Sequence, residues 1–363
     1  MPTASWPHWP PRWSICSASS TPQCRCRRCR IAEARVEARV RGPTRRHSRR
    51  LSASEPSRAS KGVPRPTDGL DKIVIHRRGG YDRLRLERHV LPRLSAQDVH
   101  VQVHAAGVNY ADCVVRMGLY SSAKDYVGWP ITPGFEVAGV VARVGGDVTD
   151  VRVGDEVIAV TRFGGYASDL VVPRRQVFAI PRGMTMVQAA AVPAVYLTAY
   201  HAAVELARPK HGAHVLVHSA AGGVGGALVQ IARVLGCHVV GVVGGAHKVE
   251  HAHALGAHAV IDRSAGRLWD EAETHSPAGY DVVFDANGVD TLGASLRHLA
   301  PMGRLIVYGF ASMLPRADQK LRWWRLAWHW LRTPRISPFD LTTRNRSVMG
   351  FNLSYLFDHA KLL

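Results

Sequence analysis

The hydrophobic pattern of residues 72–181 is typical of β-strands. The stretch "DVHVQVHAAGVN" alternates apolar and polar positions with period two, as a half-buried strand does. Further strand candidates are "KIVIHR", "YDRLRLERHV", "FEVAGVVARVGGDVTDVRVGDEVIAV", which reads as two strands joined by a Gly/Asp turn, and "GGYASDLVVPRRQVFAIP", while "NYADCVVRMG" reads as a short helix. We therefore predict a strand-rich domain, a β-barrel, over residues 67–184.

The pattern changes to alternating strands and helices after residue 184. "MTMVQAAAVPAVYLTAYHAAVEL" has a helical pattern that is interrupted at Pro193. After it, the strand candidates "HVLVHS", "HVVGVVG", "HAVID", "DVVFDA" and "GRLIVYGF" alternate with the helix candidates "GVGGALVQIARVLG", "AHKVEHAHALG" and "VDTLGASLRHLA". This spacing predicts an α/β domain with a doubly wound parallel sheet over residues 185–352.

Charge separates a basic tail from the rest of the chain. Residues 1–66 hold 15 Lys and Arg against 3 Asp and Glu, whereas residues 67–363 hold 32 against 25. The tail has no hydrophobic periodicity, so we expect it to be disordered. It is a spurious extension upstream of the true start, a transit peptide or a nucleic-acid-binding arm. We favour the first of these and expect no nucleic-acid partner.

The cysteines indicate neither a zinc site nor a disulfide framework. Four of the six lie in the tail among arginines, as a C-x-C-x-x-C run and Cys16, without a second ligand pair. Cys113 and Cys237 are far apart in the sequence. This usage fits a reducing compartment, and we expect a cytoplasmic protein. No apolar run reaches the roughly 18 residues that a membrane-spanning helix needs.

A glycine turn follows the first strand of the second domain. "HVLVHSAAGGVGGALVQIA" matches the dinucleotide fingerprint G-x-G-x-x-G, with Ala220 in place of the first glycine. The alternative is that these glycines only let a helix pack closely on a strand. We predict that the turn binds a dinucleotide pyrophosphate at the helix N-terminus. The predicted contacts are Ala221, Gly222, Gly223, Val224 and Gly225.

The end of the next strand favours NADPH over NADH. An NAD site places an acid there to bind the ribose 2′-hydroxyl. Here "VVGVVGGAHKVE" carries Gly241 and Gly244 and has no acid before Glu250. Lys248 and Arg263 are candidate cations for a 2′-phosphate, although either side chain could instead be an ordinary solvated charge.

Several motifs in order carry a family resemblance. They are "AAGVNYADCVVRMGLY", "PGFEVAGVVARVG", "VGDEVIAV", "LTAYHAAVELARPKHGAHVLVHSAAGGVG" and "GRLIVYGFAS". The chain resembles the medium-chain dehydrogenase/reductase superfamily, in its zinc-free quinone oxidoreductase (zeta-crystallin-like) branch, and "LRWWRLAWHWLRTPR" is closest to the vesicle amine transport protein-like sub-branch. The resemblance implies a groES-like β-barrel catalytic domain, a Rossmann NADP-binding domain and an active site between them. Zinc-bearing relatives carry Cys and His at the positions of Asn109 and Phe135, so we expect no metal.

The resemblance also implies a reaction and its residues. Hydride passes from NADPH to a small-molecule quinone or α,β-unsaturated carbonyl, in a homodimer. Asn109 is expected to face nicotinamide and substrate, although its alternative role is to cap the following helix. Tyr120 is a proton donor or simply a packed aromatic, and Asp112 makes a structural hydrogen bond.

Four further cofactor contacts follow from the resemblance and from strand ends. Thr198 is expected near the nicotinamide ribose. Asn287, Gly309 and Phe310 follow strands at their carboxyl ends, where doubly wound sheets bind ligands.

The segment "LRWWRLAWHWLR" has a second possible function. At 100° per residue, Arg322, Arg325, His329 and Arg332 form a narrow stripe, and tryptophan and leucine cover most of the remainder. Such a helix covers the cleft, packs at a subunit interface or lies on an anionic membrane, and we favour packing or an interface. The alternative function is therefore a catalytically weak, membrane-associated nucleotide-binding protein.

The chain ends at "SYLFDHAKLL". In the family that it resembles, a longer section continues from here and completes the catalytic domain. We read residues 353–363 as the start of a truncated return to that domain. We therefore expect reduced stability and doubtful activity for this chain.

Overall fold

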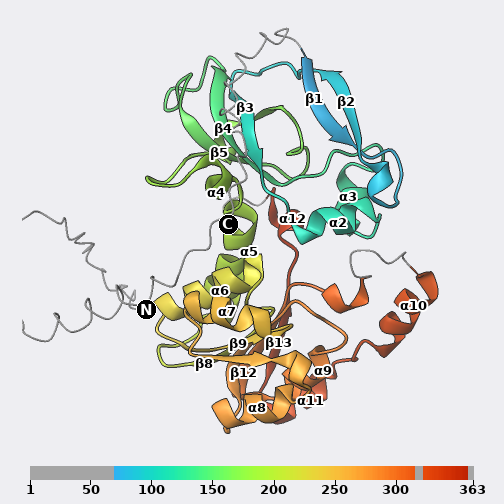
Figure 1. The fold of residues 1–363 in the computed structure, drawn as a ribbon, viewed down its shortest axis with the longest axis vertical. Helices are drawn as coiled ribbons and strands as arrows, with labels where there is room; N and C mark the ends of the chain where they lie inside the picture. The colour runs from blue at the N-terminus through green and yellow to red at the C-terminus, as the bar shows by residue number, and fades with distance from the viewer. Residues whose placement is uncertain (1–68, 315–321, 359–363) are drawn as a thin grey trace, which may run out of the picture. The chain divides into compact units, whose positions relative to one another are not determined.

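The computed structural model describes residues 69–314 and 322–358 (Figure 1). All of them belong to one compact unit, Pro64–Leu363. The predicted tail, residues 1–66, lies outside the described residues and stays a prediction.

The first part of the described chain is built on antiparallel strands, as predicted. A five-stranded sheet has the order β6-β3-β4-β5-β7, and a separate hairpin pairs β1 with β2. The bounds of its elements are β1 Gly69–Val74, β2 Arg85–Val90, β3 Asp98–Ala106, α2 Tyr110–Arg116, α3 Ser121–Tyr126, β4 Glu136–Val144, β5 Glu156–Val160, β6 Asp169–Pro173 and β7 Val177–Ala179.

Alternating valines form the core of this sheet. Val99 and Val101 of β3 are fully buried and pack with Val137 and Val141 of β4. Their period of two is the one that the sequence shows, and it directs one face of each strand inward. Gly139 pairs with Val103 in the sheet, and a Cβ atom on it would come within 2.0 Å of the Gln102 carbonyl oxygen, so only glycine fits there.

The second part is a six-stranded parallel sheet of order β10-β9-β8-β11-β12-β13 with helices on both faces (Figure 1). This is the doubly wound topology predicted from the alternation of strands and helices. Its elements are α4 Met186–Ala190, α5 Pro193–Tyr200, a π-helix His201–Ala207, β8 His214–His218, α6 Gly223–Val234, β9 His238–Val243, α7 Val249–Ala254, β10 Ala259–Asp262, α8 Leu268–His275, β11 Tyr280–Asp285, α9 Leu292–Arg297, β12 Leu299–Val307, α10 Trp323–Arg332, α11 Pro338–Arg344, β13 Ser347–Gly350 and α12 Leu353–Leu356.

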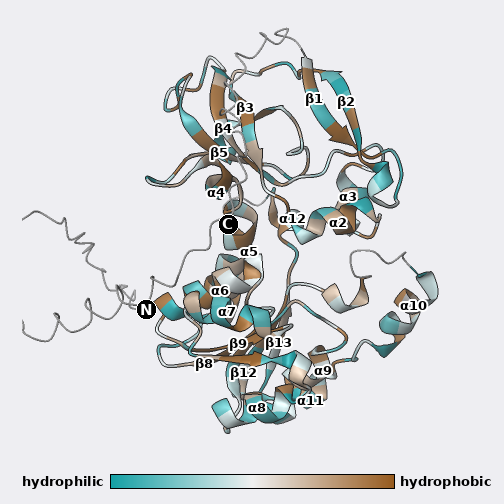
Figure 2. Cartoon of the chain, in the orientation of Figure 1, coloured by the Kyte–Doolittle hydropathy of each residue, from teal (hydrophilic) through white to brown (hydrophobic). Residues whose placement is uncertain are grey.

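The central strand β11 is buried on both faces. Phe284 packs into a cluster with residues of α5, α6 and α7, and Val283 packs into a second cluster with residues of α8 and α9. Consecutive residues of a strand face opposite sides, so these two side chains define the two cores. The near-continuous apolar pattern of "DVVF" follows from this double burial. In Figure 2, hydrophobic stretches of the sheet are brown.

The boundary region and the last strand differ from the sequence pattern. The helix break at Pro193 is confirmed, since α5 begins at that residue. However, Ala189 and Ala190 of α4 pack on Ala138 and Ile158 of the first sheet, so α4 packs with the first domain although it follows residue 184. Strand β13 and helix α8 were not expected from the sequence.

The segment after β13 contacts the first domain. Ser354 of α12 donates a 2.7 Å hydrogen bond to the Ser122 hydroxyl, and the Tyr355 hydroxyl donates to Asp125. Arg162 makes an ion pair with Asp358. These contacts join the segment after β13 to α3 and to Arg162, which follows β5.

Replacing Phe284 tests the importance of the doubly covered strand. Phe284→Ala removes a fully buried ring and should lower the free energy of unfolding by about 3–5 kcal/mol, because the cavity cannot collapse between two packed layers. Urea denaturation measures this, and the matched control is Phe178→Ala, whose ring is 53% exposed. Equal effects of the two changes would contradict the assigned core.

Candidate cofactor and substrate site

The glycine turn lies between β8 and α6. Gly222 is the N-cap of α6, and its N–H donates to the Ser219 carbonyl oxygen at 2.8 Å. At Gly225 a Cβ atom would come within 2.1 Å of that same carbonyl oxygen, so the helix can approach the turn only at glycine. Gly222 and Gly223 are exposed. The first turn of a twelve-residue helix thus presents backbone N–H groups without side chains in front of them.

The tight turn itself is made by a residue that the motif does not mark. Ser219 has a φ of 57°, the left-handed conformation that favours glycine. Ala220, which aligns with that glycine, is fully buried. A Cβ atom on Gly241 would lie 2.9 Å from the Ala220 Cβ, so Gly241 lets β9 pass beneath the turn. This is a packing role for Gly241 beside the predicted cofactor contact.

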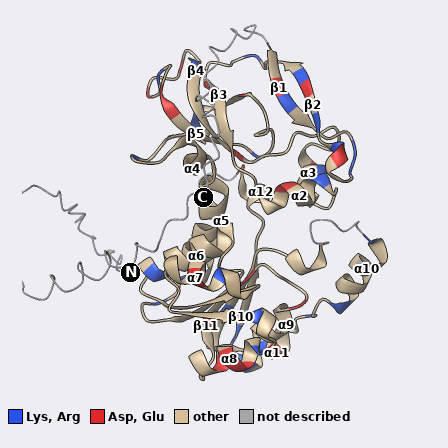
Figure 3. Ribbon diagram, viewed as in Figure 1, with Lys and Arg blue, Asp and Glu red and all other residues tan. Residues whose placement is uncertain are grey.

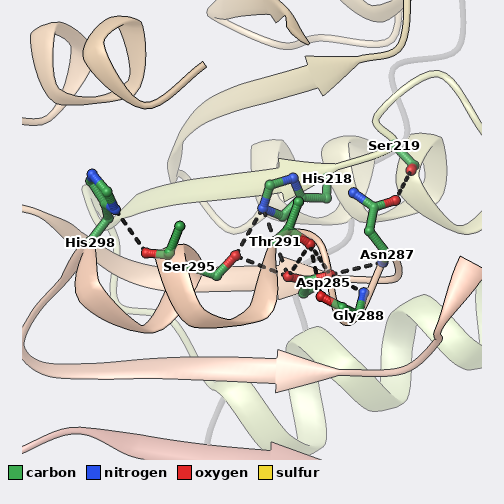
Figure 4. Close-up of polar contacts among 9 residues, drawn as sticks. His218, Ser219, Asp285, Asn287, Gly288, Thr291, Ser295 and His298 are labelled. Carbon is green, nitrogen blue, oxygen red and sulfur yellow. Dashed lines mark hydrogen bonds and ion pairs between the residues drawn. The ribbon is translucent and has the colours of Figure 1, made fainter. Parts of the chain in front are cut away.

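Asp285, at the end of β11, organises the loop that follows (Figure 4). Its fully buried carboxylate accepts hydrogen bonds from the N–H groups of Asn287 and Gly288 and from the hydroxyls of Thr291 and Ser295. Four donors satisfy a charge that would otherwise be costly to bury. The consequence is a loop with a fixed conformation directly beside the glycine turn.

Asn287 links this loop to the turn and has an unused donor. Its Oδ1 accepts from the Ser219 hydroxyl at 3.1 Å (Figure 4). Its Nδ2 is buried and has no hydrogen-bond partner among the described residues. Because an unpaired buried amide is costly, this N–H group suits a polar ligand atom at the turn.

The predicted residues Gly309 and Phe310 lie at the same sheet end. After β12, the N–H of Ala311 donates to Ala286 and that of Ser312 donates to Asn287. The Phe310 ring lies so close to Gly288 that a Cβ there would be 2.5 Å from its Cδ1. The structure therefore brings Gly309 and Phe310 together with Asn287.

The acid-free end of β9 lies next to a guanidinium group. The Nε atom of Arg263 is 3.8 Å from where a Cβ on Gly244 would be. Arg263 and Lys248 are both exposed, and within the described chain neither forms an ion pair. The nearby Asp262 carboxylate accepts hydrogen bonds from Ser264. The end of β9 therefore carries no acid of its own and is flanked by an exposed guanidinium group.

Asn109 is held by a carboxylate that the sequence patterns did not point to. Its Nδ2 donates to Glu136 Oε1 at 2.7 Å, and Glu136 Oε2 accepts from the Ala194 N–H at 2.6 Å. The backbone N–H of Asn109 donates to Asp112, as expected at the start of α2. Thus the amide has one N–H left for a ligand, while the Asn109 side chain also takes part in the capping box of α2.

Glu136 is buried because glycine makes room for it. It is 1% exposed, and a Cβ on Gly107 would come within 2.2 Å of its Oε1. Burial raises the pKa of Glu136, and the hydrogen bonds from Ala194 and Asn109 oppose that rise. The sequence offered one signal for it, a charged residue inside the apolar run "FEVAGVV".

Tyr120 and Asp112 have structural partners. The Tyr120 ring packs edge-on against Phe135 and Phe163, and its hydroxyl donates to Asn352 at 3.1 Å. Burial raises the pKa of Tyr120, which makes it a weaker acid. Asp112 accepts from the Gly134 N–H and the Tyr166 hydroxyl, which agrees with the expected structural role.

Thr198 lies on α5, whose first turn contacts the glycine turn. A Cβ on Gly223 would be 2.8 Å from Val195 Cγ1. The Thr198 hydroxyl donates to the Ala194 carbonyl oxygen at 2.6 Å, so it has only its lone pairs left for a ligand.

No group of three or more His, Cys, Asp or Glu in residues 69–314 and 322–358 is arranged to hold a metal ion. Over the same ranges, no helix is long and apolar enough to cross a bilayer.

Two family models match the chain. Residues 95–182 match the alcohol dehydrogenase GroES-like domain, and residues 223–361 match the zinc-binding dehydrogenase model. The chain is 35% identical over 306 residues to the synaptic vesicle membrane protein VAT-1 homolog of Danio rerio, covering 84% of this chain and 62% of that protein. It is 35% identical over 293 residues to the Homo sapiens protein of that name, covering 80% of this chain and 73% of the relative. This chain thus spans less than two thirds of the fish relative.

A solved structure shows the same fold. The quinone oxidoreductase of Escherichia coli complexed with NADPH superposes with a TM-score of 0.68 at 26% identity, over 80% of this chain and 84% of that one.

Acidification should destabilise the protein through His218, which lies beside the Asp285 loop. His218 is fully buried, 3.0 Å from the Ser295 hydroxyl and 4.0 Å from Asp285. Burial lowers its pKa, with Arg263 adding to this and Asp285 opposing it. Below about pH 6.5, His218 is therefore protonated in the unfolded chain but stays neutral in the folded chain. The free energy of unfolding falls as the pH drops through this range.

Chemical denaturation between neutral and mildly acidic pH measures this dependence. The raised pKa values of Asp112 and Glu136 have the opposite effect on stability, because they favour the folded chain as the pH falls. The unmodified protein is therefore compared with His218→Gln, which lacks only the His218 contribution. The variant should show a shallower loss of stability below about pH 6.5. The same slope in both proteins would disprove the role assigned to His218.

Proposed function

The chain belongs to the medium-chain dehydrogenase/reductase superfamily, and from this premise we propose that it is an NADPH-dependent reductase acting without zinc on a quinone or an α,β-unsaturated carbonyl. One observation carries the proposal: the acid-free end of β9, flanked by Arg263, lies in the same sheet as a glycine turn with exposed N–H groups. The E. coli quinone oxidoreductase, a structural neighbour, is one that was solved with NADPH.

The residues at the sheet end fit a nicotinamide dinucleotide. The N-terminus of α6 would bind the pyrophosphate, and Arg263 with Lys248 would bind the 2′-phosphate. The unpaired Nδ2 of Asn287 would donate to a polar atom of the cofactor, which removes the cost of its burial. When bound, the nicotinamide supplies the hydride.

Asn109 would provide the polarising group for the substrate. A reducible quinone or enone develops negative charge on its oxygen, so a positioned donor lowers the barrier. Glu136 holds one amide hydrogen of Asn109 and thereby fixes the direction of the other. Glu136 is thus proposed as a positioning residue, and the packed Tyr120 as a wall of the site.

The proposed absence of zinc rests on Asn109 and Phe135. These two residues stand where the resemblance places the Cys and His ligands of zinc-bearing members. An amide already bound to Glu136 and a phenyl ring are not zinc ligands. A homodimer stays part of the proposal.

Neutralising Lys248 and Arg263 should change cofactor preference. In Lys248→Ala with Arg263→Ala, KM for NADPH should rise about 10- to 100-fold while KM for NADH stays near its original value, because each charged contact to the 2′-phosphate is lost. NADPH and NADH oxidation with a quinone acceptor measure this. The control is the exposed Lys210→Ala. An unchanged preference for NADPH would reject the assigned phosphate site.

Glu136→Gln tests the positioning of Asn109. The new amide would face either the Asn109 amide or the Ala194 N–H with a donor, so one hydrogen bond is lost. We expect kcat to fall about tenfold with little change in KM for NADPH. The exposed Glu156→Gln is the matched control.

The pH profile separates positioning from a general loss of stability. As pH falls through the raised pKa of Glu136, its protonation should lower kcat in the unmodified protein. This fall of kcat on the acid side of the pH profile, the acid limb, should disappear in Glu136→Gln. A limb of the same shape in both proteins would exclude Glu136 as its cause.

A further inference from the structure

Histidine side chains line up at the amino ends of three neighbouring strands of the parallel sheet. His214 is the first residue of β8, His238 is the first residue of β9, and His258 directly precedes β10. The register pairs His214 with His238, and adjacent strands are about 4.8 Å apart, so such rings stack. The ring centroids of His214 and His238 are 5.1 Å apart, and those of His238 and His258 are 4.2 Å apart.

The three imidazoles line a cavity of about 290 Å³. Arg233, Cys237 and the glycines Gly212 and Gly236 complete its wall. A water molecule takes up about 30 Å³ of the liquid, so the cavity has room for a small ion with bridging waters. Strand β8 has five residues, which places this edge of the sheet about 16 Å from the edge that carries the glycine turn. The cavity is therefore separate from the proposed cofactor site.

His258 and Arg233 present two hydrogen-bond donors to each other. The Val239 N–H donates to His258 Nδ1 at 2.9 Å, so this nitrogen keeps its lone pair and the ring proton is assigned to Nε2. That Nε2 atom lies against Nη1 of Arg233, a group that can only donate. Leaving donors without an acceptor is costly. An acceptor within reach of both groups would remove this cost.

Two further observations indicate that the missing partner is an anion. The Nδ1 atom of His214 is buried and has no hydrogen-bond partner among the described residues. Arg233, the only charged residue of α6 (Figure 3, with Lys and Arg in blue), forms no ion pair with any described acidic residue. A guanidinium group binds oxyanions through two parallel N–H groups. Its free fork therefore suits a phosphate or sulfate.

The electrostatics of His258 give such a site a pH dependence. Burial lowers the pKa of His258, and the neighbouring Arg233 and His238 lower it further. An anion beside these groups would instead favour the protonated ring. Binding would then take up a proton, so the affinity for the anion rises as the pH falls.

The acidic groups near the cavity do not cancel its positive charge. Asp281 accepts a 2.8 Å hydrogen bond from the His214 N–H and is the carboxylate beside these rings. Burial raises the pKa of Cys237, with Asp281 adding to this, so the thiol stays neutral. The segments packed around the cavity contribute further basic residues, which are Lys210, His211 and His253.

We propose that the cavity at the amino ends of β8, β9 and β10 binds an oxyanion of the phosphate type through Arg233 and the imidazoles of His214, His238 and His258. A metal ion is excluded as the occupant, because stacked rings do not direct their lone pairs to one point and a guanidinium group repels a cation. In the described part of the chain, no cluster of potential metal ligands has a suitable arrangement. The site is independent of the reductase chemistry.

Calorimetric titration of the full chain with sulfate tests this site. Sulfate keeps its two charges in this pH range, so any pH dependence comes from the protein. The affinity should rise by up to about tenfold per pH unit as the pH falls through about 6.5, because an imidazole takes up a proton on binding. Arg233→Gln should lower the affinity about tenfold or more, since a charged donor is lost. His258→Gln should make the pH dependence shallower.

Matched variants separate this cavity from other basic surfaces. Lys248→Ala with Arg263→Ala removes the proposed phosphate contacts at the opposite edge of the sheet. Arg152→Gln and His104→Gln replace exposed side chains elsewhere. All proteins keep residues 1–66, so the basic tail contributes equally to each. None of these controls should remove the pH-dependent binding.

Inorganic phosphate and β-glycerophosphate identify the source of the oxyanion. Binding of the ester at least as tightly as of the ion would show that the cavity takes a phosphoryl group of a larger molecule, and weaker binding would identify the free ion. Either result supports the site. Two results would overturn it: Arg233→Gln binds sulfate as tightly as the unmodified chain, or the unmodified chain binds sulfate equally at every pH. NADPH is absent from these titrations, so the reductase proposal fails or holds separately.

Discussion

The buried carboxylate of Glu136 is the interaction on which the site depends most. It lies at the start of β4 and accepts hydrogen bonds from Asn109, before α2, and from Ala194, in the first turn of α5. Three segments far apart in the sequence are thereby fixed to one charged group. Because a buried charge is stable only while its donors stay in place, the carboxylate constrains their positions as much as they stabilise it.

A similar arrangement holds the loop after β11. Asp285 fixes the loop that carries Asn287, and Asn287 in turn contacts Ser219 in the glycine turn. The loop after β12 adds backbone hydrogen bonds to Ala286 and Asn287. Parallel strands bring their carboxyl ends to one edge of the sheet, so short loops from β8, β11 and β12 meet there. The apolar sheet supports this edge, while two buried carboxylates set its geometry and that of the neighbouring Asn109 segment.

The strong periodic segments were predictable because their pattern repeats over several residues. The alternation in β3 and the strand–helix order from β8 to β12 are examples. Strand β13 was not predicted, because the segment "RSVMGF" shows no clear alternation of apolar and polar positions. The glycine fingerprint marked Gly225, where the structure shows a close approach of helix and turn, but its first position falls on Ala220. The structure places the left-handed conformation at Ser219, which alters no side-chain pattern and therefore gives no signal in the sequence.

The sequence by itself determined the order of the elements, the family and the residues without side-chain bulk at the turn, because these depend on local pattern and composition. It also showed that tryptophan and arginine gather in one segment. Only the tertiary structure decided that Glu136 holds Asn109, that Asn287 retains an unpaired N–H and that three histidines line up at the amino ends of neighbouring strands. Each of these depends on which distant groups meet across the fold, and a one-dimensional pattern contains no information on such long-range pairing.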